Sequence, residues 1–104
     1  MNMKLVRDKI PEIIESDGKW CLCRKVHGKD EHLIFLRAKM IEETDEFLEN
    51  PSLEEAADIY EVLISLCKLY GFSYEDVAGA AVKKRDRRGG FMQGIILERV
   101  DEKS

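Results

Sequence analysis

The sequence predicts a mainly α-helical fold of four helices with a small two-stranded β appendage, in a single domain over residues 1–104. Apolar residues recur every three or four positions over residues 33–47 and 59–69, as on the buried face of a helix. Proline and glycine separate these periodic stretches. Only residues 19–27 alternate apolar and polar residues in the way a strand does, and an apolar stretch centred on Ile95–Leu97 offers a second strand.

The first half of the chain predicts two helices with a strand between them. Pro11 suits the first turn of a short helix that stops at Asp17-Gly18. Residues 19–27 alternate in polarity and predict a strand. Asp30 is the expected N-cap of a long helix that runs to about Glu49.

The second half predicts two further helices and a second strand. After Asn50-Pro51-Ser52 a helix runs to about Tyr70, with Ile59, Val62, Leu63, Leu66 and Leu69 facing inward, and Gly71 ends it. Ser73 predicts the start of the last main helix, which ends before Gly89-Gly90. A strand centred on Ile95–Leu97 is expected to pair with residues 20–26.

Composition narrows the classes of function. The net charge of −4 disfavours general binding of a nucleic-acid polymer. No apolar run approaches the roughly 20 residues that a membrane span needs, and the residues at the start lack the apolar stretch of a signal peptide. We therefore expect a cytoplasmic protein that does not bind a membrane. The three cysteines are expected to be reduced thiols.

The stretch IEETDEFLENPSLEEAADIYEV, residues 41–62, carries nine carboxylates around one predicted turn. In an antiparallel hairpin, Glu46 lies opposite Glu55 and Glu43 lies opposite Asp58, because each pair is equally distant from the turn. Helix axes pack about 8–10 Å apart, so these four side chains can reach a common point. Four carboxylates that close repel one another strongly unless a cation lies among them. Oxygen ligands without Cys or His favour Mg²⁺ or Mn²⁺ over zinc.

Two alternatives to a metal site are open at this point. Glutamate-rich helices are commonly solvated surfaces, and the other five acids of the stretch fit that description. Glu55 is also placed to form a capping box with Ser52. Glu43 argues most strongly for the metal site, because it continues the apolar stripe of Leu36 and Met40.

A basic cluster, KKRDRR at residues 83–88, ends the last helix. One interpretation is that these cations complement the helix dipole. The other is that they bind a polyanion such as a triphosphate, since arginine can hold phosphate through two hydrogen bonds. Lys84, Arg87 and Arg88 are the favoured phosphate ligands. Arg7 and Lys9 could reach the same anion or another subunit, or could be solvated.

Three segments together resemble a known family. The acidic pattern E-E-x-x-E at 42–46 followed by E-x-x-D at 55–58 is similar to that of the all-α nucleoside triphosphate pyrophosphohydrolases, which include MazG-like proteins, dimeric dUTPases and phosphoribosyl-ATP pyrophosphohydrolases. KLVRDKIPEII at 4–14 and RGGF at 88–91 resemble the small MazG-like, phosphoribosyl-ATP-pyrophosphohydrolase-like subgroup.

The resemblance implies hydrolysis of a nucleoside triphosphate between its α and β phosphates, giving a monophosphate and pyrophosphate. Removal of unwanted nucleotides is one role that this reaction would serve. It implies Mg²⁺ held by Glu43, Glu46, Glu55 and Asp58, with Mn²⁺ as a substitute. Glu46 or Glu43 would activate the attacking water, and Glu42 would support these ligands. The family implies a homodimer or homotetramer, in which a neighbouring subunit completes a four-helix bundle around each site.

Two departures from the family pattern affect substrate recognition. Only residues 47–54 separate the two acidic motifs, where many relatives have a longer insertion. Lys84-Arg85 and Asp86 stand where MazG-like members often carry a Lys-Asn pair.

Two other functions fit the same sequence. One is a non-catalytic sensor of metal and nucleotide, and the other is a helical protein-interaction module whose acids lie only on the surface.

Overall fold

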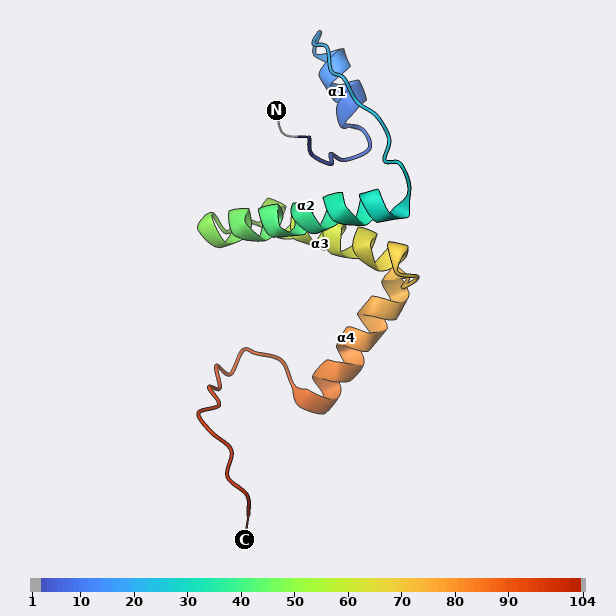
Figure 1. Cartoon of the computed structure of the whole chain (residues 1–104). Helices are drawn as coiled ribbons and strands as arrows, with labels where there is room; N and C mark the ends of the chain where they lie inside the picture. Colours follow the sequence, from blue (N-terminus) through green and yellow to red (C-terminus); the bar gives the residue numbers. More distant parts are fainter. Residues whose placement is uncertain (1–2, 104) are drawn as a thin grey trace. The chain divides into compact units, whose positions relative to one another are not determined.

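The computed structural model describes residues 3–103, and within that range the chain forms four α-helices and no strand (Figure 1). The helices are α1 (Ile10–Ser16), α2 (Lys29–Glu49), α3 (Leu53–Leu69) and α4 (Tyr74–Arg88). The mainly helical fold class is therefore confirmed. In the described part of the chain, no helix combines the length and the apolar character needed to cross a membrane.

The chain divides into two compact units, Met1–Tyr74 and Glu75–Ser104. The first unit holds α1, α2 and α3. The second unit holds α4 from its second residue onward and the segment that follows this helix. The single domain over residues 1–104 stays a prediction.

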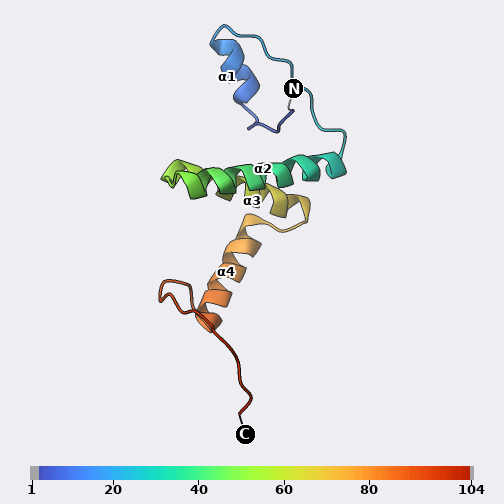
Figure 2. The same cartoon turned by 60° about the vertical axis from the view of Figure 1, so that its left-hand side comes forward.

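An antiparallel hairpin of α2 and α3 forms the centre of the first unit. The two helices, of 21 and 17 residues, are joined by residues 50–52 and run side by side in both views (Figures 1 and 2). Leu36, Val62 and Ile64 are buried, and Leu36 is only 4% exposed. Leu63, expected to face inward, is 41% exposed, while its neighbour Ile64 is buried. Successive side chains of a helix point about 100° apart, so at this position the buried face of α3 includes Ile64 rather than the predicted Leu63.

Both ends of α3 are fixed by local hydrogen bonds. The Oγ of Ser52 accepts a hydrogen bond of 3.1 Å from the backbone N–H of Glu55, which is an N-cap. At the other end, the N–H of Phe72 donates to the carbonyl of Cys67 and the N–H of Gly71 to that of Lys68. This Schellman arrangement requires Gly71 to adopt a φ of +87°, which suits a residue without Cβ. The predicted end of this helix is confirmed.

The start of α2 differs from the prediction. Its N-cap is Gly28 rather than Asp30, and Asp30 lies in the first turn. The Glu31 carboxylate instead accepts a hydrogen bond of 2.7 Å from the backbone N–H of His27, just before the helix. Arg24 donates two hydrogen bonds to the same carboxylate. The Arg24 and His27 hydrogen bonds together hold the pKa of Glu31 at about 2.

The predicted two-stranded appendage is absent from residues 3–103. Residues 19–27 and 95–97 have no regular structure, and the side chains of Trp20 and Leu22 are fully solvated. A strand exists only when its backbone N–H and C=O groups pair with a neighbouring strand. The two segments belong to different units, and neither unit supplies a partner strand among the described residues. The alternation of apolar and polar residues alone was therefore not sufficient.

Candidate metal centre

The α2–α3 hairpin brings three of the predicted carboxylates together. Glu43 comes from the C-terminal half of α2, and Glu55 and Asp58 come from the first two turns of α3. One carboxylate oxygen from each of the three lies within 4.8 Å of the others. Their positions agree with the equal-distance relation across the turn, which placed acids of the two helices at the same level.

Glu43 is buried as deeply as the core. It is 6% exposed, and it lies two turns after Leu36 on the face of α2 that packs on α3. Its Oε1 is 3.3 Å from the Lys39 ammonium, while its Oε2 is buried without a hydrogen-bond partner in the described structure. A buried charged oxygen is costly unless a donor or cation satisfies it. The position therefore fits a cation ligand better than a solvated surface residue.

Glu55 lies beside Glu43, and its carboxylate likewise combines a buried oxygen with negative charges nearby. Its backbone caps α3 through Ser52, but its own Oε2 is also buried without a partner in the described residues. Desolvation raises the pKa of the Glu55 carboxyl, and the negative charges of Glu46 and Glu43 raise it further. The capping alternative is thus compatible with the metal alternative, because the cap uses the main chain and leaves the carboxylate free.

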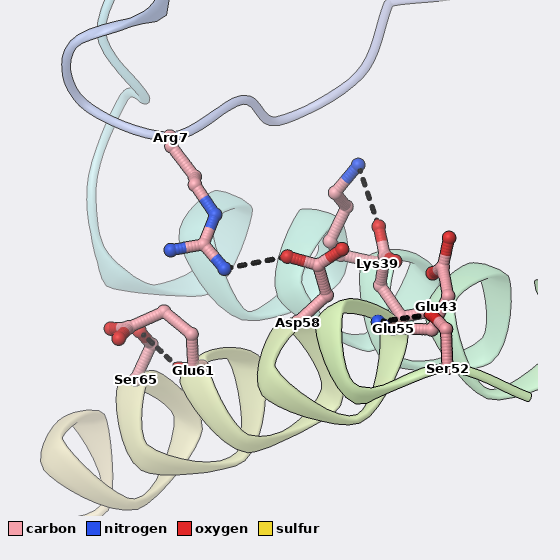
Figure 3. A network of polar contacts seen from close by, with 8 residues as sticks. All are labelled: Arg7, Lys39, Glu43, Ser52, Glu55, Asp58, Glu61 and Ser65. Atoms are coloured by element: carbon pink, nitrogen blue, oxygen red, sulfur yellow. Dashed lines mark hydrogen bonds and ion pairs between the residues drawn. The ribbon is translucent and has the colours of Figure 1, made fainter. Parts of the chain in front are cut away.

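Asp58 makes an ion pair with the N-terminal segment. The Nη2 of Arg7 lies 2.6 Å from the Oδ1 of Asp58, although the two residues are 51 positions apart. Figure 3 shows Arg7 reaching from the N-terminal segment to Asp58, with Lys39 directed at Glu43. The acidic group is therefore partly neutralised by two cations of the chain itself.

Lys39 bridges two carboxylates of its own helix. Its ammonium lies 3.4 Å from Glu42 and 3.3 Å from Glu43, at the i,i+3 and i,i+4 positions. Burial lowers the pKa of Lys39, but the hydrogen bond to Glu43 and the charges of Glu42 and Glu43 outweigh it and leave the pKa raised. Glu42 thus acts on Glu43 through Lys39. Lys39 was not predicted from the sequence, although its spacing of three and four positions from the two acids is the signal that identifies it.

Glu46 takes a more peripheral position than the sequence predicted. It is exposed, and it is not one of the three residues whose oxygens lie within 4.8 Å of one another. Its charge nevertheless contributes to the raised pKa of Glu55, which agrees with its predicted place opposite that residue. Its role as a metal ligand or base stays a prediction.

The predicted phosphate ligands lie in the second unit. Lys84, Arg87 and Arg88 are exposed on the last two turns of α4. This end of the helix places positive charge where the helix dipole is negative, as the simpler interpretation expects. Their binding of a phosphate stays a prediction.

The three carboxylates suit a hard divalent cation. They offer oxygen alone, and all three cysteines of the chain are free thiols away from the group. Ligands of Mg²⁺ lie at about 2.1 Å, so opposite ligands are about 4.2 Å apart. Only one pair among three ligands can be opposite, and adjacent ligands are about 3.0 Å apart, so oxygens that lie within 4.8 Å of one another would have to move closer together around the ion. The two unpartnered buried oxygens belong to residues of this same group.

A groove of about 430 Å³ runs from the acidic group along the first unit. Residues 5–8 of the N-terminal segment form one wall, and α2 and α3 form the rest. Its lining combines apolar side chains such as Leu36 and Val62 with the charged Arg7, Lys39 and Lys68.

Comparison of the chain with protein families, with curated proteins and with solved structures finds no match.

Proposed function

We propose that the chain is a Mg²⁺-dependent pyrophosphohydrolase, which cleaves a nucleoside triphosphate or a related nucleotide between the α and β phosphates. The observation that carries the proposal is the buried Glu43, whose unpartnered oxygen belongs to the same group as Glu55 and Asp58. A surface of solvated acids does not bury one of them to 6% exposure. The resemblance of the acidic motifs to MazG-like enzymes supports the same reaction.

The proposed reaction assigns a task to each acidic residue. Glu43, Glu55 and Asp58 would hold Mg²⁺, or Mn²⁺ in its place, with Glu46 as a fourth ligand. The bound ion would supply a Lewis acid and a water of lowered pKa. Glu46 or Glu43 would accept the proton of the attacking water. The water oxygen bonds to the α phosphorus, and the bond from that phosphorus to the bridging oxygen breaks, so pyrophosphate leaves.

The cations would offset charge on the phosphates. Lys84, Arg87 and Arg88 stay our candidates on α4, because arginine and lysine stabilise developing negative charge on a leaving phosphate. Glu42 would hold Lys39, which in turn positions Glu43. A homodimer or homotetramer is part of the proposal, since the family that the sequence resembles completes its helical bundle between subunits.

The test is release of pyrophosphate from a panel of standard and modified nucleoside triphosphates with Mg²⁺. Glu43→Gln should lower the rate on the best substrate by more than about 100-fold, since even substitutions outside the ligand set cost metal sites 10- to 100-fold. Glu49→Gln, which removes an exposed acid from the end of the same helix, is the matched control and should leave the rate unchanged.

Two results would overturn the proposal. No substrate yields pyrophosphate, or the Glu43→Gln variant releases it as fast as the native chain does. Calorimetry then separates the remaining functions: a sensor binds nucleotide in the presence of Mg²⁺ without turnover, whereas an interaction module binds neither.

A further inference from the structure

The Arg7–Asp58 ion pair joins the N-terminal segment to the candidate metal centre. Arg7 belongs to no helix, and its guanidinium uses Nη2 for the bond of 2.6 Å to Asp58. Asp58 is one of the three residues whose oxygens could surround a cation. The guanidinium of Arg7 therefore already binds a carboxylate that the proposed metal site requires.

Arg7 and a metal ion would compete for Asp58. A guanidinium at hydrogen-bond distance neutralises much of the charge of that carboxylate and takes up one of its oxygens. A divalent cation on the same carboxylate would lie only a few ångströms from the guanidinium, and the two positive charges would repel strongly. Binding of one therefore weakens binding of the other.

The groove offers Arg7 another anion to bind. Arg7 lines this space of about 430 Å³ together with Lys39 and Lys68, next to the apolar Leu5 and Val6. Ligand pockets for small organic molecules span about 300–1,000 Å³, so the groove has room for a nucleotide. The planar guanidinium carries five N–H donors and binds phosphate through two parallel hydrogen bonds. The side chain of Arg7 is 55% exposed, which leaves it free to rotate into the groove.

We propose that Arg7 is an exchangeable counter-ion and a substrate-binding residue, which holds Asp58 in the metal-free protein and turns to a phosphate group of the substrate once Asp58 binds metal. This inference rests on the proposed function. It gives the N-terminal segment a task in the groove that the acidic motifs alone do not. It also makes phosphate binding at Arg7 depend on prior metal binding.

The exchange predicts two affinities that change in opposite directions. Mn²⁺ alone, measured by electron paramagnetic resonance, should bind the Arg7→Ala variant about two- to fivefold more tightly than the native chain, because a competing exposed ion pair is lost. Inorganic tripolyphosphate, measured by calorimetry with saturating Mg²⁺, should bind the same variant at least about tenfold more weakly, because a charge-assisted hydrogen bond is lost.

Three further variants complete the experiment. Arg7→Lys keeps the charge without the two-pronged geometry, so its tripolyphosphate affinity should fall between those of the native chain and Arg7→Ala. Arg7→Gln repeats the loss of charge with a side chain of similar length. Arg37→Ala removes the same charge from α2, at a residue that does not line the groove and that bonds to Tyr70, and it should change neither affinity by more than about twofold.

The outcomes separate this inference from the proposed function. If the native chain binds Mn²⁺ but Arg7→Ala and Arg7→Gln lower both affinities, Arg7 is a structural tie and the exchange is wrong. If neither affinity changes, Arg7 has no part in the site and the exchange is equally wrong. If the native chain binds no Mn²⁺, the metal centre itself is refuted, and the exchange with it.

Discussion

The surroundings of Glu55 disfavour the ionised form of its carboxyl group. Burial and the charges of Glu46 and Glu43 raise its pKa above the ordinary value of 4.5. A carboxyl with a raised pKa in the folded state stabilises the fold most when it is protonated, below the unfolded-state pKa. That stabilisation is lost as the pH rises through the raised pKa. At neutral pH the ionised Glu55 therefore destabilises the metal-free protein.

The Glu55→Gln variant should consequently be more stable than the native chain at pH 7 without metal. The difference should shrink as the pH falls toward 4.5, where the native carboxyl becomes protonated. Thermal unfolding followed by circular dichroism between pH 4 and pH 8 measures both effects. Addition of Mg²⁺ should raise the melting temperature of the native chain more than that of the variant. Equal melting temperatures of the variant and the native chain at pH 7 would show that ionisation of Glu55 does not destabilise the fold.

The sequence could predict the residues of the candidate site to the extent that they are local. Glu43, Glu55 and Asp58 follow from the spacing across one turn, and the structure groups these three. The exposed position of Glu46 was not predictable, because chain distance fixes the level of a residue on a helix but not the direction of its side chain. Asp58 and Arg7 are 51 positions apart, so no helical spacing could reveal their contact.

At the scale of elements, the N-cap at Ser52 stabilises the start of α3, the second helix of the hairpin. Ser52→Ala removes the acceptor for the Glu55 N–H and should lower the free energy of unfolding by about 1 kcal/mol. Urea denaturation measures this loss. The control is Ser65→Ala on the same helix. Its hydroxyl donates to the carbonyl of Glu61, and alanine is a better helix former, so this variant should be as stable as the native chain or slightly more stable. A loss as large at Ser65 would mean that the Ser52 effect is not one of capping.

Helices were predictable and strands were not, for a physical reason. A helix satisfies its hydrogen bonds within one segment, so periodicity and end signals such as Pro11 and Gly71 are enough to locate it. A strand depends on a second segment elsewhere in the chain. Residues 19–27 carry the alternation and residues 95–97 are continuously apolar, but neither segment has a partner strand within residues 3–103, and Arg24 bonds to Glu31 of α2 instead. The N-cap of α2 was missed because Gly28 contributes no side chain to the cap.

At the scale of the whole molecule, much apolar surface is exposed. In the second unit, Phe91, Met92, Ile95 and Ile96 are each at least 81% exposed, and Leu97 is 77% exposed. Only Leu36, Val62 and Ile64 are buried apolar residues among those the structure describes. Large exposed apolar patches mark surfaces at which other proteins or further copies of the same chain bind. The proposed oligomer is consistent with this exposure.

We therefore expect light scattering after size exclusion to give twice or four times the chain mass of 12.0 kDa. Ile96→Asp should lower the measured mass or raise the concentration needed for association, because a charge would have to be desolvated in the interface. Glu98→Gln, an exposed change in the same segment, is the control and should leave the mass unchanged. A mass of 12.0 kDa at every concentration would contradict the oligomer.

The local origin of the three carboxylates has a consequence for folding kinetics. Residues 43–58 contain all three and form one turn with the helix ends on either side of it. Contacts between residues close in sequence form early, because little loop entropy opposes their closure, and helices themselves form within about a microsecond. The Arg7–Asp58 pair closes a much longer loop and forms later. During refolding the acidic group thus forms before Arg7 reaches Asp58, so a metal ion present at that stage meets Asp58 without a competing guanidinium.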